Sequence, residues 1–396
     1  MPPHKPHPMR EIVLASSQAL TLRSAALAAR GLRDLARDSN WLIKKVFSGR
    51  APNLAISPAG QLCACSPLVR AGTERIALYD IELGTPSIAL SIPSEPASSV
   101  AGSRAAFAWS STGRYLMVAW PGWGNRFHAF DLRDKSSVGF SEFSTAPRCL
   151  AWSDSGRYFA SACRGGPEPR VQLWELTIRP GLSSRTNEVS EACLPDRQGP
   201  LEFSALSEAG GTRSFEQWFG APPVDAESGD EGTFAGFGRM AFSPNESALA
   251  SVVEMEGEWA DDSIVVLDVP TLRRLRVFPA QGHVTGLAWT FDSRNLIYCS
   301  GGQAYRLSSD SPASEPLPFG AELVACHPRL PLCLCFSSWL KNSAKGRLFV
   351  ADLNARITRD EYAAEGVVDL RWSVEGSKAY SVTPDGLAYI YEPPLL

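Results

Sequence analysis

The sequence predicts an all-β fold, a seven-bladed β-propeller of four-stranded blades. A short motif returns seven times along the 396 residues, at intervals close to the length of one blade. Five of the motifs are followed by an alternating strand that ends in an acidic residue. The 32 glycines and 30 prolines supply the many turns that an all-β chain needs.

Residues 1–40 precede the first motif and are predicted to form a tail and a short helix. Six apolar residues fall on one helical face, namely Ala25, Ala28, Ala29, Leu32, Leu35 and Ala36. A second interpretation stays open, because residues 1–33 hold four arginines against the single acid Glu11, which is typical of an organelle transit peptide. Residues 41–396 are assigned to the propeller.

The next element is a strand at residues 41–47, which we expect to close the ring. The last blade has only three strands of its own, at residues 370–372, 379–382 and 388–391. A propeller cannot leave an open sheet edge at this point, so the strand at 41–47 is the natural fourth strand. Deleting residues 1–48 is therefore expected to abolish folding.

The repeated motif reads apolar, any residue, Trp or Phe, Ser, two turn residues, Gly, polar and apolar, and its best copies lie at residues 107–117 and 150–160. The serine or its equivalent, the marker residue, occurs at Ser57, Ser110, Ser153, Ser243, Thr290, His327 and Ser373. Five of the six intervals between markers are 37 to 53 residues, and the sixth is 90. We interpret the long interval as an insertion at about 177–237 between blades 3 and 4, with an eighth blade as the alternative.

The third strand of a blade is predicted at residues 76–80, 127–131, 171–175, 265–268 and 349–352, from period-two alternation. The sequence Leu173-Trp174-Glu175 and the strands that end in Asp resemble the Trp-Asp end of WD40 repeats, and Gly282-His283 resembles the Gly-His of that family. The resemblance covers about residues 41–396 and implies the propeller fold, but it indicates little about function. Only one blade keeps Gly-His and only one keeps Trp, so the buried hydrogen-bond network of the family is expected to be incomplete.

Composition narrows the class of partner and the compartment. The net charge of −4 gives no positive field for a phosphate backbone, so nucleic acid is not expected as a partner. No run of about 18 apolar residues is present, so no membrane span is expected. Nine cysteines, many of them at predicted strand positions, are typical of reduced thiols in an intracellular protein. We expect a cytoplasmic protein, and organelle import stays open.

Motifs of catalysis and metal binding were sought in the chain. HExxH, GxxxxGK[ST] and GxSxG do not occur. The pairs Cys63/Cys65 and Cys333/Cys335 have strand spacing rather than the Cys-x2-4-Cys spacing of zinc sites, so core packing is the preferred interpretation. The sequence therefore predicts a noncatalytic protein with no metal and no cofactor.

The candidate binding residues lie in loops. In the WD40 arrangement, the loops before the first strand and between the second and third strands gather on one face, the upper face, and these loops carry recognition. Trp and acidic residues are concentrated there, at Trp120, Trp123, Glu254, Glu256, Glu258, Trp259, Asp261, Asp262 and Trp339. Tryptophan is a common interface anchor, and an acidic rim favours a basic peptide.

The predicted function is thus a noncatalytic interaction scaffold whose upper face binds a partner protein or a basic peptide. Membership of a larger complex is compatible with this prediction. Two alternatives stay open. The acidic loop of blade 4 is either a binding site or merely solvated. A propeller-framed enzyme, such as a metal-dependent hydrolase or lactonase, would use the same acidic residues to hold a metal.

Overall fold

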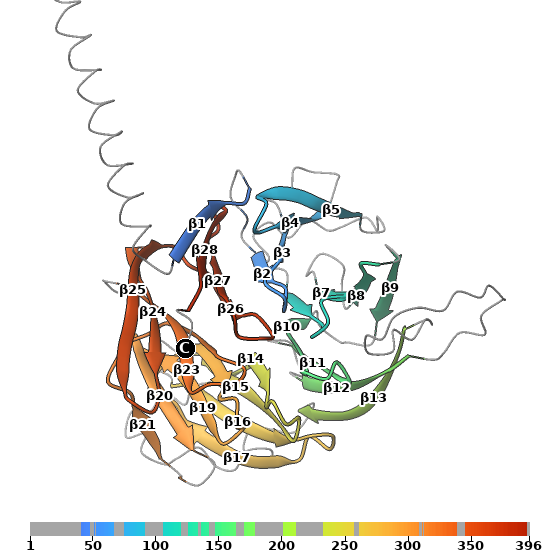
Figure 1. The fold of residues 1–396 in the computed structure, drawn as a ribbon. Helices are drawn as coiled ribbons and strands as arrows, with labels where there is room; N and C mark the ends of the chain where they lie inside the picture. The colour runs from blue at the N-terminus through green and yellow to red at the C-terminus, as the bar shows by residue number, and fades with distance from the viewer. Residues whose placement is uncertain are drawn as a thin grey trace, which may run out of the picture.

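The computed structural model describes residues 41–47, 51, 53–66, 75–91, 106–119, 126–133, 136–141, 147–163, 170–178, 201–210, 233–256, 261–308, 311, 313–338 and 345–393. Within these ranges, 28 strands form seven four-stranded antiparallel sheets around a centre, as Figure 1 shows. The predicted seven-bladed all-β propeller is confirmed. The predicted N-terminal helix lies outside the described residues, as does the segment resembling a transit peptide.

The blades follow one another along the chain. Blade 1 has β2 (Asn53–Ile56), β3 (Leu62–Ser66), β4 (Arg75–Asp80) and β5 (Thr85–Ser91). Blade 2 has β6 (Ala106–Trp109), β7 (Tyr115–Ala119), β8 (Arg126–Asp131) and β9 (Ser136–Ser141). Blade 3 has β10 (Pro147–Trp152), β11 (Tyr158–Cys163), β12 (Arg170–Ile178) and β13 (Leu201–Gly210). Blade 4 has β14 (Thr233–Phe242), β15 (Ala248–Glu256), β16 (Ser263–Asp268) and β17 (Arg274–Pro279).

The remaining blades complete the ring. Blade 5 has β18 (Val284–Trp289), β19 (Asn295–Ser300), β20 (Gln303–Ser308) and β21 (Ser314–Pro316). Blade 6 has β22 (Leu323–Cys326), β23 (Leu332–Ser338), β24 (Lys345–Asp352) and β25 (Ile357–Glu365). Blade 7 has β26 (Asp369–Trp372), β27 (Ala379–Val382) and β28 (Leu387–Tyr391), with β1 (Trp41–Lys45) as its fourth strand. In Figure 1, the blue β1 lies beside the red β28.

The pairing of β1 with β28 confirms the predicted closing strand. The two strands are antiparallel, with Trp41 opposite Tyr391 and Lys45 opposite Leu387. Because β1 comes from the start of the propeller and β28 from its end, this sheet joins the two ends of the ring.

Strands also fill part of the long interval between the markers of blades 3 and 4. The fourth strand of blade 3, β13, and the first residues of β14 both lie between residues 177 and 237. Residues 179–200 and 211–232 lie outside the described residues. The described strands of this interval belong to the seven sheets, and none of them forms a further blade.

Each marker residue is buried at the turn between the first and second strands of its blade. In six blades its side-chain oxygen accepts a hydrogen bond, at 3.0 to 3.2 Å, from the backbone N–H five residues later. In blade 6 His327 replaces the hydroxyl, and its Nδ1 accepts from the N–H groups of Arg329 and Leu330, both at 3.0 Å. The seven-fold motif is therefore a turn motif, and the chain repeats it because every blade needs the same turn.

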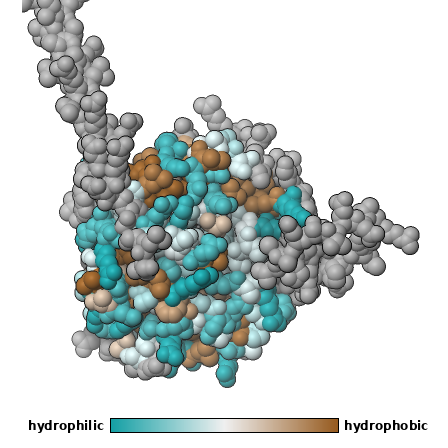
Figure 2. Space-filling view, in the orientation of Figure 1, coloured by the Kyte–Doolittle hydropathy of each residue, from teal (hydrophilic) through white to brown (hydrophobic). Residues whose placement is uncertain are grey.

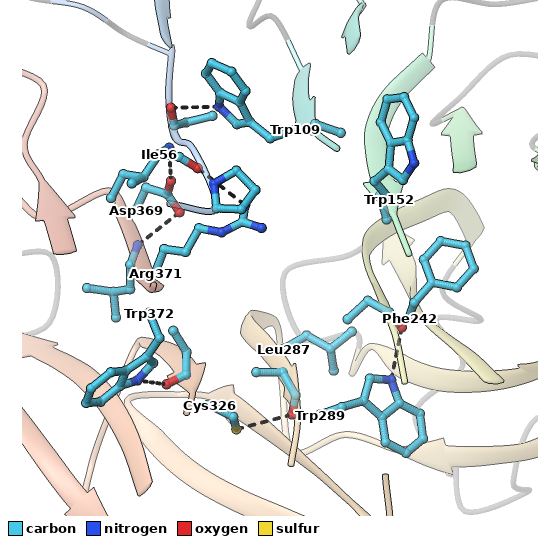
Figure 3. A pocket seen from close by; sticks show the side chains of 18 of the residues that line it. Ile56, Trp109, Trp152, Phe242, Leu287, Trp289, Cys326, Asp369, Arg371 and Trp372 are labelled. Carbon is cyan, nitrogen blue, oxygen red and sulfur yellow. Dashed lines mark hydrogen bonds between the residues drawn. The ribbon is translucent and has the colours of Figure 1, made fainter. Parts of the chain in front are cut away.

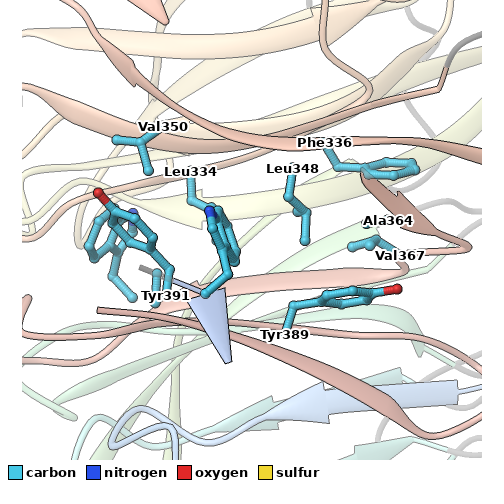
Figure 4. Packing of buried hydrophobic residues seen from close by; sticks show 11 residues of the cluster. Leu334, Phe336, Leu348, Val350, Ala364, Val367, Tyr389 and Tyr391 are labelled. Atoms are coloured by element: carbon cyan, nitrogen blue, oxygen red, sulfur yellow. The ribbon is translucent and has the colours of Figure 1, made fainter. Parts of the chain in front are cut away.

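The core is divided between the blades. Each of the seven clusters of buried apolar side chains found in the described part of the chain joins two neighbouring blades. Figure 4 shows the cluster between blades 6 and 7, where Leu334 and Leu348 pack near Tyr389 and Tyr391. Burial of these faces holds neighbouring blades together, since a single twisted sheet cannot cover its own apolar side.

The outer surface is mixed in character. On the side shown in Figure 2, apolar residues form separate patches among hydrophilic ones. No helix in the described ranges is long and apolar enough to cross a membrane.

Candidate functional site

The propeller has two faces that the chain uses differently. Since strands alternate in direction, the turns that join strands one to two and three to four lie on one side, the turn face. The loops between strands two and three and the connections between blades lie on the opposite side, the upper face. Five predicted binding residues lie outside the described residues: Trp120, Trp123, Glu258, Trp259 and Trp339.

The remaining predicted binding residues flank the upper-face loop of blade 4. Glu254 and Glu256 lie at the end of β15, and nothing is described of the Glu256 side chain. Glu254 is partly buried and lies against Gly238 of β14. Asp261 is exposed, directly before β16. The structure thus brings two described acids, Glu254 and Asp261, to one end of one blade.

Asp262 has a contact that the sequence did not predict. Its side chain is only 2% exposed, and Oδ2 accepts a hydrogen bond of 2.8 Å from the N–H of Val284. Oδ1 lies 3.3 Å from Nδ1 of His283, the histidine that resembles the family Gly-His. Asp262 therefore ties the loop of blade 4 to the first strand of blade 5. Its role in partner binding stays a prediction.

A central channel runs through the ring and forms a cavity of about 620 Å³. The first strands of all seven blades line it, and Figure 3 shows the lining side chains from close by. In Figure 1 the first strands β2, β10, β14 and β26 lie towards the centre, and the fourth strands β5, β13 and β17 lie outermost. The volume is in the range of about 300 to 1,000 Å³ that is typical of small-molecule sites.

Indole groups link the first strands around the channel. Three tryptophans that precede a marker donate from Nε1 to a carbonyl of the preceding blade: Trp109 to Ala55 at 3.2 Å, Trp289 to Ala241 at 3.0 Å and Trp372 to Ala325 at 3.0 Å. Trp152 departs from this pattern and donates to Gly156 of its own turn, at 3.1 Å. In the three bonds between blades, the accepting carbonyl belongs to the residue two positions before a marker.

That position is alanine in six blades and arginine in the seventh. The alanines are Ala55, Ala108, Ala151, Ala241, Ala288 and Ala325. In blade 7 the equivalent residue is Arg371, which extends from β26 beside Ile56 (Figure 3). A guanidinium group thus enters a channel that the other blades line with methyl groups at this level.

Arg371 and Asp369 join blade 7 to blade 1. An Asp369 carboxylate oxygen accepts from the N–H of Ile56 at 3.0 Å, and Nη1 of Arg371 donates to the Ile56 carbonyl at 3.3 Å. Burial raises the pKa of Asp369, and the Ile56 N–H and Arg371 oppose that shift. Burial lowers the pKa of Arg371, opposed by the charges of Asp369 and Asp154. Blade 1 has Ile56 where blades 2, 5 and 7 have an indole that donates to the preceding blade, and the Asp369–Arg371 pair links blades 7 and 1 instead.

Asp154 of blade 3 and Arg371 of blade 7 line the same cavity and lie within electrostatic range of each other. Asp154 follows the marker of blade 3, lines the cavity and is accessible through it. Burial on its protein side raises the pKa of Asp154; the charge of Arg371 lowers it, and that of Glu246 raises it. Within the described part of the chain, Asp154 and Arg371 form no ion pair with each other, and the Asp154 carboxylate accepts no hydrogen bond. Two opposite charges are therefore held apart across the channel.

A collar of mostly apolar residues, which includes Asp154, lines the cavity on the turn face. It consists of the residue that follows each marker, Pro58, Ser111, Asp154, Pro244, Phe291, Pro328 and Val374, and all seven line the cavity. Phe291 is 38% exposed and Val374 51%. Apolar walls with a few polar groups are the usual composition of a small-molecule site.

The channel also contains Arg239 and Cys149. Arg239 lies on β14, is exposed to the channel, and lowers the pKa of Asp369. Burial raises the pKa of the Cys149 thiol to about 11, so this cysteine remains protonated at neutral pH. No group of three His, Cys, Asp or Glu side chains that could hold a metal is found among the described residues.

The channel residues were not predicted from the sequence, although the motifs carry a signal for one of them. Arg371 stands out once the seven motifs are aligned on their markers, because the position two residues earlier is otherwise invariably alanine. Asp154 appeared only as a turn residue of a good motif copy. An alignment of the seven motifs does not show which side chains point into the channel. The geometry of the ring provides that information.

Known proteins are similar to this chain in fold. No family model matches the chain, and no curated protein matches it. Among solved structures, the β-propeller domain of Myceliophteria thermophila Cps50 (Swd1) covers 89% of this chain and 100% of its own, with a TM-score of 0.54 and 13% identity. A chain of the mitotic checkpoint complex covers 88% and 92%, with a TM-score of 0.56 and 11% identity. U3-55K covers 89% and 98%, with a TM-score of 0.56 and 11% identity. The chain thus has the WD40-like propeller fold that its motifs predicted.

Proposed function

We propose that the protein is a noncatalytic scaffold whose upper face binds a partner protein through a basic segment. The supporting observation is the loop of blade 4, whose end is fixed by buried Asp262 while the neighbouring Asp261 is exposed. A fixed loop loses less conformational entropy when a partner binds, and exposed carboxylates attract lysine and arginine side chains.

The loop sequence extends this acidic surface. Glu256 and Glu258 precede Asp261, and Trp259 lies among them, so cation–π contact and ion pairing would act on the same basic segment. Trp120, Trp123 and Trp339 are proposed as further anchors in the corresponding loops of blades 2 and 6. One of the similar structures is that of a protein complex, the mitotic checkpoint complex, which supports a role in assembly.

Affinity capture tests the proposal. The wild type is compared with a variant carrying Glu256→Lys, Trp259→Ala and Asp261→Lys, and with a control variant, Glu375→Lys, whose exposed side chain lies on the turn face. The loop variant should lose a partner that the wild type and the control both retain, and the retained binding should weaken as ionic strength rises. An identical set of partners for all three proteins would exclude the acidic surface.

The alternative is a propeller-framed enzyme that uses the same acids to hold a metal. Metal analysis of the purified protein separates the two functions. Stoichiometric zinc or calcium, removed by the loop substitutions, would favour a metal-dependent hydrolase or lactonase. A protein that binds its partner fully after chelation supports the scaffold.

A further inference from the structure

The central channel presents two opposite charges that do not satisfy each other. Arg371 comes from blade 7 and Asp154 from blade 3, and both line the cavity. Each influences the pKa of the other, so the two lie within electrostatic range, yet they form no ion pair in the described structure. The rigid first strands and turns hold them apart.

Both groups keep unused hydrogen-bonding capacity. A guanidinium has five N–H donors, and Arg371 uses one of them, on the Ile56 carbonyl, within the described part of the chain. The Asp154 carboxylate accepts no hydrogen bond there. Asp154 is exposed to the cavity and Arg371 is half-buried beside it, so both can bind a ligand group of opposite charge.

The fold alone does not explain the arginine. Six blades form the same turn with alanine two positions before the marker. The link between blades 7 and 1 needs only one N–H of the guanidinium, together with the Asp369 carboxylate. A shorter neutral donor would supply that bond without the cost of burying a charge.

The surroundings indicate what the two charges bind. A cation is favoured next to Asp154, because Glu246 adds a second acid close by. An anion is favoured next to Arg371, whose guanidinium can hold a carboxylate in a bidentate manner. The apolar collar, with exposed Phe291 and Val374, provides a surface for an aliphatic or aromatic side chain.

We propose that the central channel is a binding site for a free α-amino acid with an apolar side chain. Its carboxylate binds Arg371, its ammonium group binds Asp154, and its side chain packs against the collar. The amino acid carries an ammonium group and a carboxylate on one carbon, so it offers a partner of opposite charge to each of the two residues. The cavity of about 620 Å³ accommodates such a ligand together with water. This inference does not depend on the upper-face function.

Isothermal titration with leucine, N-acetylleucine and leucinamide tests the proposal on the full chain. The three probes share a side chain, but the second lacks the positive charge and the third lacks the negative charge. Leucine should bind at least about tenfold more tightly than either analogue, because each analogue lacks one of the two charge-assisted contacts. Phenylalanine and methionine should bind, and glutamate and lysine should not.

Two substitutions assign the selectivity to the two residues. Arg371→Gln keeps an N–H donor for Ile56 and should remove the preference for leucine over leucinamide. Asp154→Asn should remove the preference for leucine over N-acetylleucine. Glu375→Gln, an exposed residue of the neighbouring turn that does not line the cavity, serves as the control and should bind like the wild type. Melting curves confirm that each variant is folded.

Three outcomes would overturn the proposal. The first is that none of the apolar amino acids binds at millimolar concentration. The second is that leucine and its analogues bind equally, which would show an apolar pocket without charge recognition. The third is that Arg371→Gln and Asp154→Asn leave the selectivity unchanged, which would place the ligand elsewhere. A failure of the upper-face capture experiment leaves all three readouts unaffected.

Discussion

Trp41 is the residue whose replacement should weaken ring closure most. Its side chain is 2% exposed, packs on the ring of Tyr391 at 4.9 Å, and donates from Nε1 to the carbonyl of Asp360 at 2.8 Å. Replacing a buried tryptophan by alanine costs about 3 to 5 kcal/mol of the free energy of unfolding. Trp41→Phe keeps a ring but removes the hydrogen bond from Nε1 to the Asp360 carbonyl, which costs about 0.5 to 1.5 kcal/mol.

The melting temperature should follow these energies. At about 2.1 cal/mol/K of unfolding entropy per residue, a propeller of this size loses about 1 to 1.5 °C per kcal/mol. Trp41→Ala should therefore melt about 3 to 7 °C below the wild type, and urea unfolding should show the same order of stability. Leu42→Ala is the control, since this neighbour on the same strand is 46% exposed. Equal losses for Trp41→Ala and Leu42→Ala would refute the assignment of ring closure to the buried face of β1.

Three further predictions test the ring, the turns and the markers. A variant that lacks residues 1–48 should fail to fold, whereas a variant that lacks residues 1–40 keeps β1 and should melt cooperatively. If the two variants gave similar circular dichroism spectra, closure of the ring by β1 would be disproved. Burial lowers the pKa of His327, so the folded state resists its protonation. The contribution of His327 to the free energy of unfolding is complete above about pH 6.5 and declines as the pH falls through the lower folded pKa. His327→Ser introduces the serine that five other blades have as their marker, and urea titrations of this variant at pH 5 to 8 should no longer show the decline on the acid side. Gly60 has a φ of +72°, and a Cβ at this position would lie 1.8 Å from the Tyr380 ring. Gly60→Ala should therefore lower the free energy of unfolding by more than about 2 kcal/mol, and adding Tyr380→Leu should recover part of that stability. A wild-type melting curve for Gly60→Ala would contradict this packing.

Local chemistry made the blades predictable. The marker hydroxyl bonds to an N–H only five residues later, so the whole turn is encoded in a few consecutive residues. The third strands were equally clear, because they are rich in apolar residues that the fold buries, as in β16. The closing strand could be inferred from topology, since the last blade lacked one strand.

The fourth strands were less visible for a physical reason. They form the outer edge of each blade and have one solvated side, as the largely exposed β25 shows. Such a strand needs no regular apolar pattern, and its pairing is set by the neighbouring strand. The fourth strand of blade 3, β13, therefore fell within the interval that the sequence analysis interpreted as an insertion.

The candidate site was predicted only in part, because loop residues carry no periodic signal. The acids of blade 4 could be assigned to one loop, but Asp262 was expected on the surface and is buried against Val284. Its burial depends on the start of the next blade, 22 residues later, which no local pattern reveals.

Arg371 shows how a repeat separates structural needs from other needs. What all blades require is found in all blades, and the alanine two positions before the marker is such a feature in six of them. The seventh blade meets an additional structural need, the link to Ile56, which uses one N–H of the guanidinium and the carboxylate of Asp369. The charge of Arg371 and its remaining donors serve neither need, and burial makes that charge costly. In a ring of equivalent blades, a charge that only one blade carries and that the fold does not need can be recognised by comparing the blades. The channel at Arg371 is therefore where a function separate from the scaffold should be sought.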